Sequence, residues 1–409
     1  IKIKNTKKYF YHMKNLFIFF AVCISYLSYS QQYLHQVLIL NEGYFDFSLN
    51  QTVVPPTIGS YDPISEVYTT LDTLTNSRFA SDMIIEGDFV YVAADNILYK
   101  YDKNTMNIIA TQNISGIRNL AVWNDKIAVS RGDYDNTTFA PILFNSYLQF
   151  YNTSDLSFYS ELDTITGPKW STQNMIVEND NLYITINNAF EFGNEKGIVG
   201  VVDMTSMSYI NEIDLGPDGK NPDNLLIRGN KLYTVNNKDW SGASISEIDI
   251  TSSNSTTTNI SLVSTGCGTS CLKDDKIIYQ ISQDTELYEW DLLTAPNAGS
   301  PLGFSQNFYE LAVNNLDGYI YASSTDFFSY GTINIYDQNN NFVKSFNTSI
   351  TPGKIIFDTR NTSVSINEIN PIIEKENTIF DLNGKQINSI KNTTNGVYIL
   401  NGKKVFIKR

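Results

Sequence analysis

Short runs in which apolar and polar residues alternate, each ending at a polar turn, extend over most of the chain. Val90-Tyr91-Val92 and Leu182-Tyr183-Ile184-Thr185-Ile186 are typical, and they are rich in the β-branched and aromatic residues that favour strands. No long stretch repeats its apolar residues with the helical period of about 3.6. The pattern therefore predicts an all-β protein made of many short antiparallel strands.

A short signature recurs within this pattern: a strand ends in a bulky residue, an Asp or Asn follows, and a polar turn comes next. Such a side chain can accept hydrogen bonds from backbone N–H groups two residues on and so fix a hairpin turn. The steps between successive signatures are about 40 to about 51 residues, which is typical of four-stranded propeller blades. We therefore predict a seven-bladed β-propeller. The seven signatures are Tyr61-Asp62, Tyr101-Asp102, Tyr151-Asn152, Val202-Asp203, Ile248-Asp249, Trp290-Asp291 and Tyr336-Asp337.

A second tight turn, with residues suited to positive φ, lies upstream in every unit except the first. The first unit therefore lacks its innermost strand. We expect Gly353-Lys354-Ile355-Ile356-Phe357 to supply that strand from the far end of the chain, which would close the ring and cover an open sheet edge. The six turns are Gly87-Asp88, Asn124-Asp125, Asp180-Asn181, Gly229-Asn230, Asp274-Asp275 and Asp317-Gly318.

The strands after these inner turns, such as Leu232-Tyr233-Thr234-Val235-Asn236, resemble the repeats of YVTN or YncE-like seven-bladed propellers. The opening Leu40-Asn41-Glu42-Gly43 looks like the start of exported propellers of this group from Bacteroidetes. The resemblance implies one propeller domain over residues 31–360, with four-stranded antiparallel blades closed by a C-terminal strand.

The N-terminal residues 1–30 have the pattern of upstream residues followed by a signal peptide. Met13 and Lys14 precede an apolar run from Leu16 to Leu27, which is too short to span a bilayer. Ser28-Tyr29-Ser30 predicts cleavage before Gln31. A lipoprotein acylated at Cys23 is the alternative. No run of about 18 apolar residues follows, so no transmembrane segment is expected in the mature chain.

Residues 361–409 break the repeat. Asp381-Leu382-Asn383-Gly384-Lys385, Asn395-Gly396-Val397-Tyr398-Ile399-Leu400 and the basic strand Lys403 to Lys408 resemble, in order and spacing, the type A sorting domain of type IX secretion. The family's upstream Pro-Asn-Pro segment is reduced here to Asn370-Pro371. The resemblance implies a small C-terminal β domain and the type IX secretion machinery as a partner. A small β domain that only adds stability is the alternative.

The net charge of the chain restricts the kinds of partner that we expect it to bind. The formal net charge is −14, from 29 basic and 43 acidic residues. The first 30 residues hold five lysines and no acid, so the remainder has 24 bases against 43 acids, or −19. An acidic body repels phosphate backbones, so nucleic-acid binding is disfavoured. The simplest interpretation of this charge is solubility outside a cell. The leader and the C-terminal tail together predict an exported protein that is extracellular or on the outer cell surface.

Histidine is nearly absent, which restricts the chemistry. Apart from His12 before Met13, the chain has only His35. No Ser-His-Asp set, Cys-His pair or His-based metal site can be assembled. The segment Asp133-Tyr134-Asp135-Asn136 matches the pattern of a calcium-binding loop only weakly. We expect no cofactor, metal or catalytic residue of these types, although a carboxylate pair remains open.

Two cysteines follow the leader, Cys267 and Cys271, within Cys-Gly-Thr-Ser-Cys. An oxidising compartment would permit a disulfide between them. Spacing alone does not fix the geometry, so the bonded and free states both remain open.

Aromatic residues gather in the loops expected on one rim of the ring. These loops join the second and third strands of a blade or enter the next blade, and the opposite rim carries short polar turns. Aromatic side chains in irregular loops favour a ligand surface over a role in the strand core. Packing among themselves is the alternative. The predicted ligand-binding residues are Tyr44, Phe45, Arg78, Phe79, Arg118, Tyr134, Trp170, Phe190, Trp240, Tyr309, Phe328 and Tyr330.

These observations favour a non-catalytic binding module for a small molecule, a glycan or a surface receptor. Because some exported propellers of the resembled group hand nutrients such as corrinoids to outer-membrane transporters, an outer-membrane receptor is one implied partner. A carboxylate-based polysaccharide-active enzyme and a structural or adhesive surface protein are the alternatives.

Overall fold

The computed structural model describes residues 31–238, 242–261, 269–282, 284–294, 299–362, 379–387, 393–400 and 403–408. The leader and Asn370-Pro371 lie outside these ranges. The described ranges consist of strands, turns and irregular segments, and they contain no helix long and apolar enough to cross a membrane. The all-β prediction is thereby confirmed.

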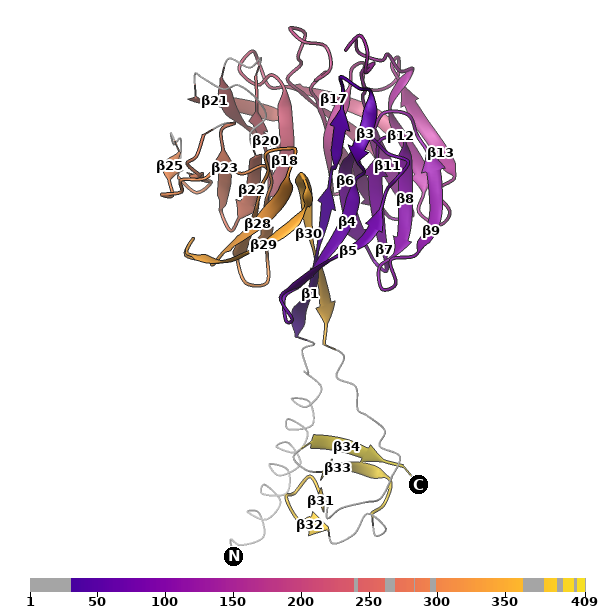
Figure 1. The fold of residues 1–409 in the computed structure, drawn as a ribbon, viewed down its shortest axis with the longest axis vertical. Helices are drawn as coiled ribbons and strands as arrows, with labels where there is room; N and C mark the ends of the chain where they lie inside the picture. Colours follow the sequence, from indigo (N-terminus) through magenta and orange to yellow (C-terminus); the bar gives the residue numbers. More distant parts are fainter. Residues whose placement is uncertain are drawn as a thin grey trace, which may run out of the picture. The chain divides into compact units, whose positions relative to one another are not determined.

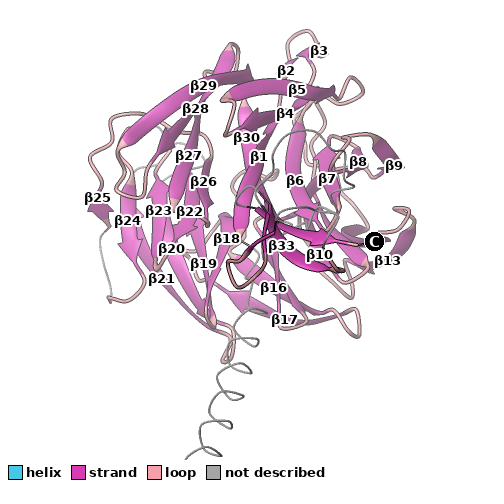
Figure 2. Cartoon of the chain, turned by 90° about the horizontal axis from the view of Figure 1, so that it is seen from below, coloured by secondary structure: helices cyan, strands magenta, loops and turns pink. Residues whose placement is uncertain are grey.

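Seven four-stranded sheets follow one another between Gln32 and Asn361, and Figure 2 shows them arranged around a common centre. The first contains, in order from the centre outward, β30 (Pro352–Asn361), β1 (Gln32–Asn41), β4 (Thr57–Asp62) and β5 (Val67–Thr73). The second contains β6 (Ala80–Glu86), β7 (Phe89–Ala94), β8 (Ile97–Asp102) and β9 (Ile108–Asn113). The third contains β10 (Ile117–Trp123), β11 (Lys126–Arg131), β12 (Ser146–Asn152) and β13 (Phe158–Asp163).

The remaining four sheets repeat this order. They contain β14 (Thr172–Glu178), β15 (Asn181–Ile186), β16 (Ile198–Asp203) and β17 (Ser208–Asp214); β18 (Pro222–Arg228), β19 (Lys231–Asn236), β20 (Ala243–Asp249) and β21 (Asn254–Ser261); β22 (Thr269–Lys273), β23 (Lys276–Gln280), β24 (Tyr288–Asp291) and β25 (Ser300–Pro301); and β26 (Leu311–Asn314), β27 (Tyr319–Ser324), β28 (Tyr330–Tyr336) and β29 (Phe342–Ile350). A two-stranded hairpin, β2 (Tyr44–Asp46) with β3 (Gln51–Val54), is inserted between β1 and β4.

The predicted closing strand is confirmed. Residues 353–357 lie within β30, which is hydrogen-bonded to β1 and forms the inner edge of the first sheet (Figure 1). The junction continues beyond the ladder, because the Glu42 amide donates to the Thr351 carbonyl at 2.8 Å. Both ends of the unit Leu34–Thr359 therefore meet in one sheet.

The core lies between neighbouring sheets. Each apolar cluster joins one sheet to the next: Leu38 and Ile58 of the first sheet pack with Met83 and Val90 of the second. The order closes on itself, because Tyr321 and Ile333 of the last sheet pack with Val37 and Ile39 of the first. Since both faces of each sheet are covered in this way, the strands carry continuous apolar runs at their inner ends.

The recurring Asp fixes the outer hairpin as predicted. Asp203, for example, accepts from the amides of Thr205 at 2.8 Å and Ser206 at 3.0 Å. Asn152 departs from the pattern, because its amide donates to the Ser157 hydroxyl and Asp155 accepts the turn amide instead. The equivalent acceptors in the other units are Asp62, Asp102, Asp249, Asp291 and Asp337.

The inner turns also behave as expected, since each predicted pair contains a residue with positive φ. Those residues are Gly87, Asn124, Asp180, Gly229, Asp274 and Gly318.

The C-terminal residues form a separate four-stranded sheet, in the order β32 (Gln386–Ile387), β31 (Ile379–Phe380), β33 (Gly396–Leu400) and β34 (Lys403–Ile407). Ile379, Tyr398 and Val405 form its small buried core. Asp381 accepts from the amides of Asn383 and Lys385, both at 2.9 Å, and Gly384 has φ of 79°. The DLNGK segment therefore owes its composition to one tight turn.

Candidate functional site

Polar residues begin the innermost strands of the second to fifth sheets and bond each of these sheets to the next. Ser81 donates to the Arg118 carbonyl at 2.6 Å, and Arg118 Nη2 donates to Gln173 Oε1 at 2.8 Å. Gln173 Nε2 then donates to Asp223 Oδ1 at 2.9 Å. Irregular register at the start of β6, β10, β14 and β18 interrupts the sheet ladder beside these residues. The innermost strands of these four sheets thus line the central channel with a row of hydrogen-bonded polar side chains.

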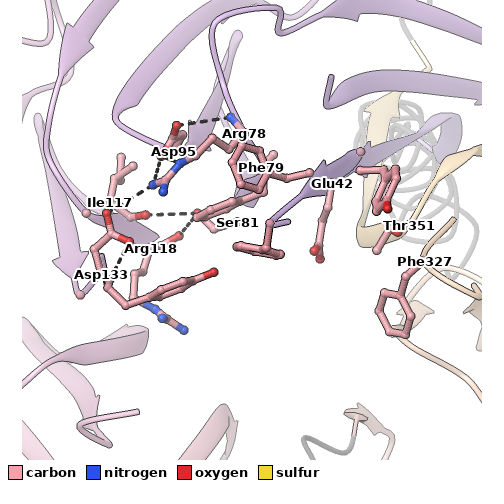
Figure 3. A pocket seen from close by; sticks show the side chains of 18 of the residues that line it. Glu42, Arg78, Phe79, Ser81, Asp95, Ile117, Arg118, Asp133, Phe327 and Thr351 are labelled. Atoms are coloured by element: carbon pink, nitrogen blue, oxygen red, sulfur yellow. Dashed lines mark hydrogen bonds and ion pairs between the residues drawn. The ribbon is translucent and has the colours of Figure 1, made fainter. Parts of the chain in front are cut away.

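A cavity of about 560 Å³ opens at the end of this channel where the predicted aromatic loops gather. Figure 3 shows Arg78, Phe79, Glu42 and Phe327 around it. A neighbouring cavity of about 410 Å³ shares Phe47, Arg118, Tyr134, Gln173 and Phe190 with it and extends toward Asn187 and Asp223. Volumes of this size suit a small molecule.

Nine of the predicted site residues line the larger cavity. They come from the inserted hairpin, the loops entering the second and seventh sheets, the inner end of β10 and the long loops of the third, fourth and seventh sheets. They are Tyr44, Phe45, Arg78, Phe79, Arg118, Tyr134, Phe190, Tyr309 and Phe328. The structure therefore brings these residues together, and their binding role stays a prediction.

The other three predicted residues do not line the larger cavity. Trp170 lines an adjoining cavity of about 210 Å³, which shares Asp133 and Phe190 with the larger one. The Lys196 ammonium lies 4.9 Å from the centroid of the Trp170 ring. Tyr330 begins β28 and is 78% exposed. Trp240 lies outside the described residues.

The cysteine pair falls partly outside the described residues. Cys271 is buried on β22, packed with Ile278 and Leu287, and is bonded to no described cysteine. Cys267 is not described, so the bonded and free states of the pair both stay open.

Arg78 organises one wall of the cavity (Figure 3). Its Nε donates to Asp95 Oδ1 at 2.9 Å and its Nη1 donates to Asn136 Oδ1 at 2.6 Å. Its Nη2 lies 3.4 Å from Asp133 Oδ2. Asp95 and Asp133 are both buried. The guanidinium therefore ties the second sheet to the loop that carries Tyr134, and its donors are engaged by protein acceptors.

Aromatic rings also line the mouth of the cavity. Phe47, from the inserted hairpin, lies 5.0 Å from Phe45 and 6.3 Å from Tyr134 by ring centroids. Tyr134 lies 5.5 Å from Phe190, and the Arg118 guanidinium lies 4.5 Å from the Phe190 centroid. Residues from the first, third and fourth sheets thus form one continuous aromatic surface.

Carboxyl groups within the channel have raised pKa values. Burial raises the pKa of Glu42 to about 7, although the hydrogen bond from Tyr309 lowers it. Burial also raises the pKa of Glu310 to about 8; nearby Lys354 lowers that pKa, and Asp223 and Asp82 raise it further. Groups of this kind change charge near neutral pH, so the channel's charge responds to pH.

Several contributors were absent from the predicted site, among them Glu42, Gln173 and Asp223. A signal for the last two does exist in the sequence. The innermost strands of the second to fifth sheets each place two polar residues before their first core residue, as in Arg118-Asn119-Leu120 and Gln173-Asn174-Met175. Aligning the units on that core residue would have placed Gln173 and Asp223 in the channel. Among the described residues, no group of three or more His, Cys, Asp or Glu could hold a metal ion.

Comparisons with known proteins support the fold. No family model and no curated protein matches the chain. A putative 6-phosphogluconolactonase from Bacteroides fragilis is similar in structure, with a TM-score of 0.55 and 10% identity over 79% of this chain and 98% of that one. A hypothetical selenium-binding protein from Sulfolobus tokodaii has a TM-score of 0.56 and 11% identity over 80% and 94%. Dihydro-heme d1 dehydrogenase NirN, in complex with DHE, has a TM-score of 0.51 and 12% identity over 80% and 75%. These structures are β-propellers, and likeness at such low identity shows the fold alone.

Proposed function

We propose that this propeller is a non-catalytic binding module that captures a small molecule or a glycan in the cavity at the end of its channel. The observation that carries the proposal is the convergence of aromatic and polar side chains from five sheets on one cavity of about 560 Å³. Aromatic faces provide apolar contact at low entropic cost, and a few polar groups orient the ligand.

The row of hydrogen bonds from Ser81 to Asp223 supports this role because it holds the cavity's polar groups in place before a ligand arrives. Gln173 both accepts from Arg118 and donates to Asp223, so its amide orientation is set by its neighbours. A preorganised site loses less entropy on binding than a mobile one.

The binding test is a screen of the full chain against soluble metabolites and oligosaccharides by thermal shift, followed by calorimetry on each ligand found. Tyr134→Ala combined with Phe190→Ala removes the central aromatic surface, so we expect at least a tenfold loss of affinity, or about 1.4 kcal/mol. Phe158→Ala, at an exposed ring on outer strand β13, is the matched control. Equal affinity in the double variant and the control would place the ligand elsewhere, and a screen without any ligand would favour an adhesive role.

We further propose that the chain is an exported YncE-like protein, with a propeller over 31–360 and a type IX sorting domain over 361–409. The tail's DLNGK turn and its NGVYIL strand, paired with a basic strand, support the second part. The test compares surface delivery of the full chain with that of a chain ending at Arg360, in a host with type IX secretion. We expect the truncated protein to remain in the periplasm. Undiminished delivery to the surface would contradict the sorting role.

A further inference from the structure

Glu42 is a carboxyl group built into the wall of the cavity. Its backbone amide donates to the Thr351 carbonyl at 2.8 Å, and its Oε1 accepts from the Tyr309 hydroxyl at 2.9 Å. A Cβ added at Gly353 would overlap Glu42 Oε1, so the glycine leaves the space that the carboxyl group occupies. The side chain projects into the cavity between Phe79 and Phe327 (Figure 3). The position of the Glu42 carboxyl group is therefore fixed by contacts with the C-terminal residues of the propeller that close the ring.

Four aromatic rings line the cavity together with this carboxyl group. Tyr309 and Phe327 meet edge to face, with centroids 5.3 Å apart, and Tyr44 and Phe328 do the same at 5.2 Å. All four rings line the same cavity as Glu42. An edge-to-face pair presents the face of one ring next to the edge of the other. The four rings therefore offer several π faces to a group placed beside the Glu42 carboxylate.

Three cations of the channel and the cavity have other protein partners. Lys354 Nζ lies 3.3 Å from Asp82 Oδ1, and the Arg78 guanidinium is bonded to Asp95 and lies 3.4 Å from Asp133. Arg118, which lines the same cavity, donates to Gln173 and lies over the Phe190 ring. No described lysine or arginine acts on the pKa of Glu42, so the charge of an ionised Glu42 is left for a ligand to compensate.

We propose that the cavity binds an organic cation, an alkylammonium group that sits among Tyr44, Tyr309, Phe327 and Phe328 with the Glu42 carboxylate as its counter-ion. The inference rests on the proposed binding function and specifies its ligand class. Aromatic faces and a carboxylate both attract a cation, and neither rewards a neutral group of the same shape in this way.

The pH dependence of binding follows from the protonation of Glu42. Its pKa is about 7, so the carboxyl group is largely neutral below that pH and ionised above it. A quaternary ammonium ion does not titrate, so its affinity should rise as the pH increases through about 7. Glu310 and Lys354 face the same channel, and the ionisation of Glu310 near pH 8 would reinforce the rise.

The experiment measures binding of choline and of its uncharged isostere 3,3-dimethylbutan-1-ol to the full chain by calorimetry at pH 5.5 and pH 8.5. We expect choline to bind at least tenfold more tightly than the isostere at pH 8.5 and to lose most of this advantage at pH 5.5. E42Q keeps an acceptor for Tyr309 and should reduce the preference to the part that the aromatic faces supply, and it should abolish the pH dependence. F327L should weaken choline binding several-fold. E86Q, at the exposed end of β6, is the matched control.

The outcomes separate the two proposals. Equal affinity of the unaltered chain for choline and the isostere, or a preference of the same size and pH dependence in E42Q, would overturn the cation inference. The binding function would still stand if another ligand lost affinity in the Tyr134→Ala and Phe190→Ala double variant. Failure of choline, the isostere and every screened ligand to bind would overturn both.

Discussion

The Lys354 ammonium lies 3.3 Å from the carboxylate of Asp82, which joins the closing strand β30 to the innermost strand of the next sheet. The Asp82 side chain is almost fully buried, and its other oxygen accepts from the Leu120 amide at 2.9 Å. The neighbouring Asp82 charge is the main cause that raises the pKa of Lys354. One ion pair therefore connects the first, second and third sheets at the centre of the molecule.

Replacing Lys354 should destabilise the folded protein. K354M leaves Asp82 buried without its cation, and we expect a loss of about 3 kcal/mol in the free energy of unfolding, measured with urea. K344M breaks the exposed pair with Glu66, at 2.6 Å, and should cost at most about 1 kcal/mol. A K354M variant no less stable than K344M would show that the central pair has no structural role.

The stability of the protein should fall as the pH rises from about 4.5 to about 8 because of Glu310. Its pKa is about 8 in the folded protein against an ordinary 4.5, so the folded state holds a proton that the unfolded state has released across this window. E310Q cannot ionise. Its Tm should equal that of the wild type near pH 4.5 and exceed it by about 2–4 °C at pH 9.

The matched control for this series is E86Q, which changes an exposed acid. Its Tm should differ from that of the wild type by the same small amount at every pH. If E310Q also showed a constant difference, the ionisation of Glu310 would not be linked to folding.

Arg78 should act on the cavity through the loop that it holds. R78K keeps the charge but loses the planar fork that reaches Asp95, Asn136 and Asp133 together. We expect faster amide hydrogen exchange in residues 133–142 and a loss of about 1–2 kcal/mol in the free energy of unfolding. Exchange in β17, on the fourth sheet, serves as the internal reference. Unchanged exchange in 133–142 would show that the loop holds its shape without the guanidinium.

Part of the site was readable from the residues themselves. Tyr134 and Phe190 stand in long loops whose place on one rim follows from the strand order, and both line the cavity. Trp170 and Tyr330 also stand in or beside such loops, yet Trp170 lines only a smaller, adjoining cavity and Tyr330 is exposed on β28. The loop in which a residue stands determines the rim on which it lies, whereas the direction of its side chain depends on packing.

The sequence by itself determined the all-β ring, its closure by residues 353–357 and the turns governed by Asp203 and its equivalents. These features depend on local alternation, turn chemistry and period, which are properties of neighbouring residues. Only the tertiary structure decided that Glu42, Tyr309 and Phe327 would surround one space, and that Arg78 would be engaged by Asp95 and Asn136. Such contacts join residues far apart in the chain, and their burial and pKa values arise from the packing of whole sheets around the channel.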